Sequence, residues 1–338
     1  MLLYFYVCLT MLFRSVALPG TTGDYATEYV LPLVILKLPR SGSSWLTEKL
    51  NAIPSVFISK EIVQRGDRNE FSSTEIEGHF IKALLRPTGK LSSSKEYLPT
   101  GRFFEDYLFH GSFKFLNKMR IVGFTVNPEH CKDVRWHRVS AAVPGMRIVA
   151  LIRSNMVKTA LSGYRGKQSA DTCGSSNLRH SSRASCTLPA TVDWSIGEFA
   201  RQVTSWQSRY DHFFRILNRI RTVDRIDVES VNYEDLQQNL SYSLIRVFNA
   251  VGLPFSAATS LVSLEQRSPL NHGWIKRSSE ELRSILSHYT EIEEALVRGQ
   301  CSCLLSQMRS TNATSFLPCH ERFDAQDRRC YATRSRVV

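Results

Sequence analysis

Residues 31–46 read LPLVILKLPRSGSSWL and carry the clearest structural signals of the chain. Its first eight residues form an apolar run that Pro39 ends, which is typical of a strand buried on both faces of a parallel sheet. A helix is predicted directly afterwards, because Ser43 and Ser44 can cap a helix whose apolar face includes Trp45. The stretch therefore predicts a strand, a tight loop and a helix.

Further apolar runs and amphipathic segments alternate along the chain. Strands are predicted at 120–126, 146–152 and 225–231, and helices at 156–164, 195–221, 236–248 and 278–286. This alternation over residues 30–290 predicts an α/β three-layer fold around a central parallel sheet. Two stretches lack the pattern, at 61–118 and 167–190, and we expect them to be insertions over one face of the sheet.

The loop after the first strand has the features of an anion-binding site. Gly42 lets backbone N–H groups point at one place, where the N-terminus of a helix adds about half a positive charge. Arg40 lies beside it, together with the hydroxyls of Ser41, Ser43 and Ser44. The GxxxxGK[ST] motif is absent, which argues against ATP or GTP hydrolysis. The loop predicts a P-loop-like cradle for an anion, and the alternative is an ordinary turn with a serine cap.

The chain resembles a known family at this loop. Residues 39–46, PRSGSSWL, are similar to the phosphosulfate-binding loop of sulfotransferases that use 3′-phosphoadenosine 5′-phosphosulfate (PAPS). Two later segments resemble further family elements in the same order, RIVALIRSN at 147–155 and VNYEDL at 231–236. The resemblance spans about residues 32–290 and looks closest to carbohydrate-acting and nodulation-factor members.

The resemblance implies a set of donor-binding residues. The phosphosulfate loop would contribute Arg40, Ser41, Gly42, Ser43, Ser44 and Trp45. The 3′-phosphate would be held by Arg153 and Ser162, which are nine residues apart where the family usually has eight. PAPS is then the expected co-substrate, and no metal is expected.

The same resemblance implies the catalytic groups. Sulfuryl transfer needs a base for the acceptor hydroxyl and a cation for the leaving phosphate oxygen, for which Arg40 is placed. Glu61 is the predicted base, because carbohydrate-type relatives carry a catalytic Glu after the loop helix. His130, beyond the second strand, is the second candidate. The alternatives are a surface glutamate and a structural histidine.

The N-terminus predicts entry into the secretory pathway. Residues 2–13 carry no charge and would span roughly 18 Å as a helix, short of a ~30 Å hydrocarbon core. Small residues at Ser15 and Ala17 fit signal-peptidase cleavage after residue 17. A buried N-terminal strand or helix and an uncleaved signal-anchor are the alternatives. Sequons at Asn239 and Asn312 fit a lumenal protein.

Cysteine usage points to the same compartment. Four of the eight cysteines fall in the last 38 residues, at Cys301, Cys303, Cys319 and Cys330. This clustering is typical of disulfides in an oxidising compartment, and zinc is the alternative. Cys173 and Cys186 are expected to be bridged across their loop, while Cys131 has no assigned partner. The seven cysteines outside the signal segment leave one thiol free or paired with another chain.

The net charge of the chain points to an anionic partner. The chain has 43 Lys and Arg against 31 Asp and Glu, a net charge of +12 spread along its length, which favours an anionic partner. We expect three parts: a signal peptide at 1–17, a sulfotransferase domain at 30–296 and a Cys-rich tail at 297–338. The expected acceptor is a carbohydrate, and an acidic carbohydrate fits the charge better than a neutral one. We expect the protein to act in the Golgi lumen or to be secreted. We expect neither a nucleic-acid partner nor a transmembrane span. The alternative is a catalytically silent secreted protein that binds sulfated polyanions.

Overall fold

The structure is a computed structural model of the chain. It describes residues 31–53, 56–59, 61, 71–85, 121–173, 189–253, 281–310, 319 and 321–332, with single residues at 255, 258, 259, 262 and 263. The predicted signal peptide, Cys186 and the sequon at Asn312 lie outside the described residues.

A parallel sheet forms the centre of the fold. Its strands within the described residues are β1 (Leu31–Lys37), β2 (Val56–Ser59), β3 (Ile121–Val126), β4 (Arg147–Ile152) and β5 (Val228–Asn232). They lie in the order β2-β3-β1-β4-β5, and each neighbouring pair is parallel. The predicted α/β fold with a central parallel sheet is therefore confirmed.

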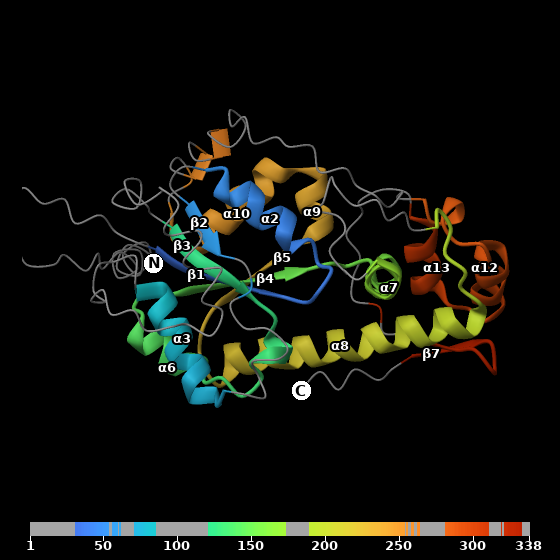
Figure 1. Ribbon diagram of the computed structural model, residues 1–338, viewed down its shortest axis with the longest axis horizontal. Helices are drawn as coiled ribbons and strands as arrows, with labels where there is room; N and C mark the ends of the chain where they lie inside the picture. Colours follow the sequence, from blue (N-terminus) through green and yellow to red (C-terminus); the bar gives the residue numbers. More distant parts are fainter. Residues whose placement is uncertain are drawn as a thin grey trace, which may run out of the picture.

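Helices cover both faces of the sheet (Figure 1). Along β1, Leu33 and Ile35 face one apolar cluster, and Val34 and Leu36 face the other. The first cluster includes residues of α2 (Ser43–Asn51), α9 (Tyr233–Gln238) and α10 (Leu240–Ala250). The second includes residues of α3 (Ser73–Leu85), α6 (Trp136–Ala142), α7 (Met156–Cys173) and α8 (Ile196–Thr222). Burial on both sides explains why β1 reads as a continuous apolar run.

The C-terminal part packs against α7 and α8 at the end remote from α6 (Figure 1). It consists of α12 (Tyr289–Arg298), α13 (Ser302–Arg309) and a hairpin of β6 (Glu321–Asp324) and β7 (Arg329–Ala332). Disulfides join Cys301 to Cys330 and Cys303 to Cys319. The predicted disulfides of this segment are confirmed, and they exclude these cysteines as zinc ligands in the oxidised protein.

Cys173 and Cys131 are the other two cysteines that the structure describes. Cys173 is disulfide-bonded, and its expected partner Cys186 is outside the described residues. Cys131 is buried and is the free thiol among the described cysteines. The predicted boundary at residue 296 falls inside α12, and the division of the chain there stays a prediction.

Two predicted helices differ from the structure. The helix predicted over 236–248 is divided at Asn239, whose backbone leaves the helical region at φ −145° and whose Oδ1 accepts a hydrogen bond from Tyr242 N at 3.0 Å. The helix predicted over 278–286 is described only from residue 281, where a 3-10 helix (Leu282–Ser284) is followed by a bridge from Leu286 to Val192.

The stretch 61–118, predicted to be an insertion without clear periodicity, contains α3. The strand predicted from residue 225 begins only at Val228, after Arg225 with a left-handed φ of 55°. Among the helices of the described residues, none is both long and apolar enough to cross a membrane.

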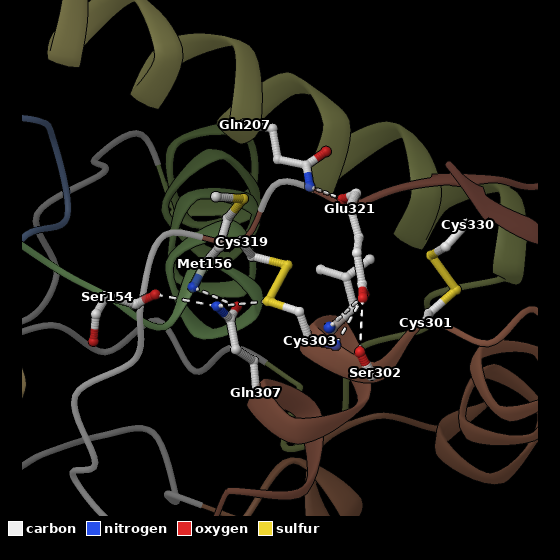
Figure 2. The surroundings of a disulfide bond; sticks show 11 residues. Ser154, Met156, Gln207, Cys301, Ser302, Cys303, Gln307, Cys319, Glu321 and Cys330 are labelled. Carbon is white, nitrogen blue, oxygen red and sulfur yellow. Dashed lines mark hydrogen bonds between the residues drawn. A yellow bond between two sulfur atoms is a disulfide. The ribbon is translucent and has the colours of Figure 1, made fainter. Parts of the chain in front are cut away.

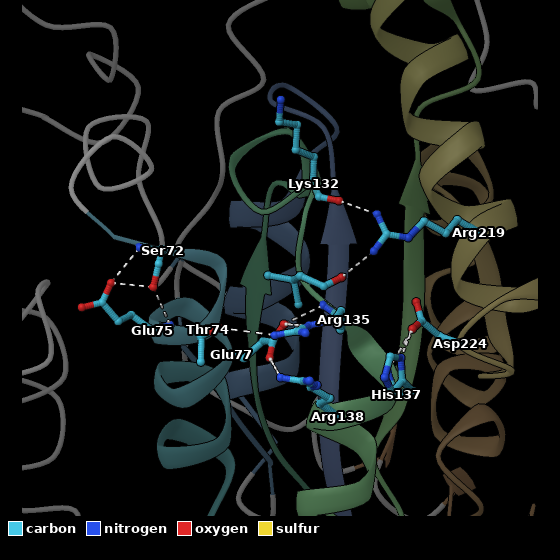
Figure 3. A network of polar contacts seen from close by, with 11 residues as sticks. Ser72, Thr74, Glu75, Glu77, Lys132, Arg135, His137, Arg138, Arg219 and Asp224 are labelled. Atoms are coloured by element: carbon cyan, nitrogen blue, oxygen red, sulfur yellow. Dashed lines mark hydrogen bonds and ion pairs between the residues drawn. The ribbon is translucent and has the colours of Figure 1, made fainter.

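Buried carboxylates connect the helices that lie below the sheet in Figure 1 (Figure 3). Glu77 of α3 accepts hydrogen bonds from the backbone N–H and the Nε of Arg135, at 2.9 and 3.2 Å. Asp224, after α8, accepts a hydrogen bond from His137 N at 3.2 Å, and its Oδ1 is 2.6 Å from Nδ1 of the same ring. These contacts fix α6 between α3 and the end of α8.

Candidate active site

Two residues with positive φ shape the loop between β1 and α2. Arg40 has φ 65° and Gly42 has φ 85°. A Cβ on Gly42 would lie 2.2 Å from ring atoms of Tyr233, so the position requires glycine. The predicted serine cap is wrong, because Gly42 is the N-cap of α2 and Ser43 and Ser44 are its first two residues. Gly42 has no side chain to cap the helix, so within the described residues the first N–H groups of α2 receive no cap from it and could face an anion.

The Arg40 guanidinium packs against α7. A Cβ on Gly166 would lie 1.8 Å from Nη2 of Arg40, so the guanidinium occupies the space that a side chain at 166 would take. Burial lowers the pKa of Arg40 from its ordinary value, although an arginine stays charged at neutral pH. Beside it, Ser41 is 1% exposed, and its Oγ has no hydrogen-bond partner among the described residues.

Arg153 comes from the end of β4 and reaches the same loop. Its Nη1 donates a hydrogen bond to the carbonyl of Arg40 at 3.2 Å, and its guanidinium lies 5.2 Å from the centre of the Tyr233 ring. Tyr210 of α8 holds the backbone of Arg153 through a 2.6 Å hydrogen bond to its carbonyl. The Nε of Arg153 is buried and has no hydrogen-bond partner in the described part of the chain. Ser162 lies within α7 and is 7% exposed.

Three titratable side chains meet at the carboxyl edge of the sheet. Lys37 ends β1, Glu61 follows β2, and His130 ends the 3-10 helix that follows β3 (Pro128–His130). Lys37 Nζ lies 2.6 Å from Glu61 Oε2, and His130 Nδ1 lies 3.2 Å from Glu61 Oε1. The three strands are neighbours in the sheet, which brings together residues far apart in sequence.

The neighbours of Glu61 favour its ionised form. Burial by itself raises the pKa of the Glu61 carboxyl, but the hydrogen bond from His130 and the charge and hydrogen bond of Lys37 outweigh it. The pKa of Glu61 therefore lies below its ordinary value, and the group is an anion at neutral pH. Such a carboxylate can accept a proton from a hydroxyl.

Asn127 determines the orientation of the His130 ring. The Oδ1 of Asn127 accepts a hydrogen bond from Glu129 N at 3.2 Å, which leaves its Nδ2 3.2 Å from His130 Nε2. An amide nitrogen donates, so we assign Nε2 as the acceptor and place the ring hydrogen on Nδ1, the nitrogen nearer Glu61. In this tautomer Nε2 of His130 is occupied by Asn127.

Helix α8 anchors this turn. The Glu129 carboxylate accepts hydrogen bonds from Arg209 Nε at 2.8 Å and from Arg209 Nη2 at 2.5 Å. The Arg209 guanidinium in turn lies 4.4 Å from the centre of the Trp206 ring, which restricts its movement. The residues before His130 are therefore fixed to a long helix of the core.

Several residues of the site were not found from the sequence. Lys37 had a visible signal, because it is the single charge in the apolar run of the first strand. Tyr233 lies in the VNYEDL segment, but nothing in that segment indicated its contact with the loop at Gly42. Asn127 had no signal in the sequence, because it acts through His130, which the fold brings near it. Trp45 was predicted to bind the donor, and its ring meets Tyr233 edge to face at 6.0 Å.

Comparison with known proteins identifies the family. A sequence model of the Sulfotransferase family matches residues 32–257, about two thirds of the chain. The chain therefore belongs to the sulfotransferase family, and the predicted class, a PAPS-dependent sulfotransferase, is confirmed. The match does not distinguish a carbohydrate or nodulation-factor subtype. No curated protein matches the chain significantly.

Three solved structures similar to this chain have low sequence identity to it. The sulfotransferase domain of the Synechococcus PCC 7002 olefin synthase is 16% identical, with TM-score 0.34, over 72% of this chain and 80% of that one. Mouse sulfotransferase SULT7A1 complexed with PAP is 13% identical, with TM-score 0.38, over 85% and 90%. Mycobacterium avium sulfotransferase STF9 is 10% identical, with TM-score 0.36, over 88% and 80%. Because these TM-scores are below 0.5, no site residue of this chain is assigned from the three structures.

Proposed function

We propose that the protein transfers a sulfuryl group from PAPS to a hydroxyl of a carbohydrate in the secretory pathway, with Glu61 as the catalytic base. The observation that carries this proposal is the position of the Glu61 carboxylate between Lys37 and His130, at the sheet edge from which the loop at Arg40 leaves β1.

The residues around the loop fit an anionic donor. Ser41 Oγ and Arg153 Nε are buried polar atoms without hydrogen-bond partners among the described residues. The backbone at Gly42 and the uncapped start of α2 add N–H groups, and the Arg40 guanidinium adds positive charge. Arg40, Ser41, Gly42, Ser43, Ser44 and Trp45 would hold the phosphosulfate end. Arg153 and Ser162 would hold the 3′-phosphate.

In the proposed reaction these residues remove the proton of the acceptor hydroxyl and stabilise the leaving phosphate oxygen. When bound, PAPS supplies the sulfuryl group: the acceptor oxygen forms a bond to sulfur while the bond from sulfur to the phosphate oxygen breaks. Glu61 takes the proton of the acceptor hydroxyl, and Lys37 and His130 hold the carboxylate in place beforehand. Arg40 and the N–H groups at Gly42–Ser44 balance the negative charge that develops on the leaving oxygen.

The acceptor and the compartment are inferred from other features. The disulfides of the C-terminal segment fit an oxidising compartment. The net charge of +12 exceeds what one nucleotide needs, which favours an acidic glycan over a neutral one. Asn239, in the described sequon, is exposed at the start of α10 and accessible for glycosylation.

Donor binding and transfer test the proposal separately. Isothermal titration with adenosine 3′,5′-bisphosphate (PAP) should show micromolar binding, and labelled sulfate should pass from PAPS to members of a panel of desulfated glycans. Arg40→Ala should abolish transfer while circular dichroism shows an intact fold. Full activity of this variant would overturn the loop assignment. Binding of sulfated polyanions without PAP binding would instead indicate the silent binder, and sulfation of tyrosine peptides alone would overturn the carbohydrate acceptor.

A further inference from the structure

The start of α7 is held by a residue from the C-terminal part of the chain (Figure 2). Gln307 of α13 is fully buried. Its Oε1 accepts a hydrogen bond from Met156 N at 2.9 Å, and its Nε2 donates to the carbonyl of Ser154 at 3.3 Å. Its own backbone carbonyl accepts from Asn155 Nδ2 at 2.9 Å. One residue thus contacts three consecutive residues directly after Arg153.

The opposite side of this segment is held by Glu234 of α9. Its carboxylate accepts hydrogen bonds from the backbone N–H groups of Ser154 at 2.9 Å and Asn155 at 3.1 Å. The N–H groups of Ser154, Asn155 and Met156 are therefore taken by Glu234 and Gln307, and that of Lys158 by Asn155 Oδ1 at 2.9 Å. These four are not available to an anion, so at this end of the site the side chain of Arg153 is the group proposed to hold it.

Gln307 is itself fixed by the disulfide-bonded segment (Figure 2). The Glu321 carboxylate caps α13, because it accepts hydrogen bonds from Ser302 Oγ at 2.8 Å, Cys303 N at 2.9 Å and Leu304 N at 3.3 Å. The disulfide from Cys303 to Cys319 ties the first turn of α13 to the residue two positions before Glu321. Gln307 lies one helical turn after Cys303, so its backbone cannot shift unless this capped turn shifts with it.

We propose that Gln307 is a positioning residue for the donor nucleotide: by holding Ser154, Asn155 and Met156, it sets the direction in which Arg153 presents its guanidinium to the 3′-phosphate. This inference rests on the donor site proposed above. Gln307 does not touch the nucleotide, and its amide is buried against the backbone of the segment. Replacing it leaves the buried N–H of Met156 without its acceptor and removes the donor to the half-buried carbonyl of Ser154, so the segment is expected to move.

The experiment compares Gln307→Met with Arg309→Met. Methionine keeps the volume of glutamine but makes neither hydrogen bond. Arg309 is on the same helix, is exposed, and pairs through its Nε with Glu293 at 2.7 Å. Each protein is titrated with PAP well below its melting temperature, and KM for PAPS and kcat are measured separately. Gln307→Met should bind PAP about tenfold more weakly, which corresponds to about 1.4 kcal/mol, and should raise KM for PAPS with kcat nearly unchanged.

Gln307→Glu provides a second variant in case the methionine protein does not fold. Its carboxylate can still accept from Met156 N, but it cannot donate to the Ser154 carbonyl and places a buried charge against that oxygen, so its affinity for PAP should be no higher than that of Gln307→Met. Equal PAP affinity in wild type and both Gln307 variants would overturn this inference and leave the proposed function intact. A loss of PAP affinity in Arg309→Met equal to that in Gln307→Met would also overturn it, since any loosening of α13 would then suffice. Failure of the wild-type protein to bind PAP would overturn the proposed function itself.

Discussion

The Glu61 carboxylate and the His130 ring lie side by side, with Nδ1 of His130 3.2 Å from Oε1 of Glu61. The two residues that the sequence offered as alternative bases thus belong to one arrangement. Since Asn127 faces Nε2 of the ring, the ring hydrogen is placed on Nδ1, the nitrogen nearer Glu61. This arrangement supports the proposal that Glu61 is the base and that His130 has a supporting position, and the predictions below test that proposal.

Replacing Glu61 by glutamine should lower kcat by about 10²- to 10⁴-fold, the usual contribution of a positioned base. The amide is nearly isosteric but cannot take the proton of the acceptor hydroxyl. PAP affinity should change little, because Glu61 is not among the proposed donor-binding residues. The measurement is steady-state sulfate transfer together with PAP titration, and wild-type turnover in the variant would contradict the role.

The same variant should also be less stable, and a double variant separates the two effects. The side chain of Lys37 is 8% exposed, and Glu61→Gln leaves its charge without a compensating carboxylate. Lys37→Met with Glu61→Gln should recover stability in urea unfolding without recovering turnover. Recovery of turnover together with stability would mean that Glu61 is only structural.

Replacing His130 by alanine should shift the pH dependence of transfer. The hydrogen bond from His130 lowers the pKa of Glu61, so its removal raises that pKa. The acid limb of the kcat/KM profile should therefore move to higher pH, with turnover reduced less than in Glu61→Gln. Complete loss of turnover at every pH, with an intact fold, would make His130 the base instead.

Gly166→Ala should impair transfer without destabilising the fold. The new methyl group would lie 1.8 Å from Nη2 of Arg40, the end of a flexible side chain, so the guanidinium moves and α7 stays. Alanine is the better helix former by about 1 kcal/mol, which offsets the local crowding. We expect unchanged or higher stability in thermal unfolding and a several-fold loss of turnover.

Gly78→Ala is the matched control for this prediction. Gly78 is in α3, and a Cβ there would have no atom within 4 Å. The substitution should raise stability by a similar helix-propensity gain and leave transfer unchanged. If both alanine variants transferred sulfate at the wild-type rate, the position of Arg40 would have no bearing on catalysis.

Binding of PAP should take up protons between pH 8 and 9. Burial, together with the charge of Arg153, lowers the pKa of Lys158 to about 8, against the opposing effect of Glu234. A phosphate bound near Arg153 favours the charged lysine and raises that pKa again. Titrations in two buffers of different ionisation enthalpy should give different apparent binding enthalpies, and Lys158→Met should remove the difference. If the wild type gave the same apparent binding enthalpy in both buffers, the phosphate would not be bound near Lys158.

Lys158 should also make stability depend on pH in a defined direction. Its pKa of about 8 in the folded chain lies below the ordinary 10.5, so the unfolded chain binds more protons between these values. Stability should therefore rise with pH across this window, and Lys158→Met should flatten the rise in urea unfolding. If the stability of Lys158→Met rose with pH as steeply as that of the wild type, groups other than Lys158 would be responsible for the rise.

The fold could be predicted because its decisive signals are local. The apolar runs of β1, β3 and β4 and the loop at Gly42 follow from short segments that need no knowledge of distant partners. β2 is only four residues long, and α3 lies in a stretch of weak periodicity, so neither gave a comparable signal. The break before α10 depends on one capping hydrogen bond of Asn239.

The site was harder to predict because its connections are long-range. Glu61 and His130 were each singled out, but their contact depends on β2 and β3 being neighbours in the sheet. Gln307 reads as one polar residue within a helix, and only packing shows that it is buried against α7. The pairing of the four C-terminal cysteines likewise has no local signal.

The hydrogen bond from Met156 to Gln307 also sets an order of assembly. The two residues are 151 positions apart, so the ribosome makes the Arg153 segment long before the residue that holds it. If Gln307 positions Arg153 as proposed, the proposed donor site is complete only after α13 has docked, and α13 is joined to Cys319 by a disulfide. The nascent or reduced chain is therefore expected to bind nucleotide poorly.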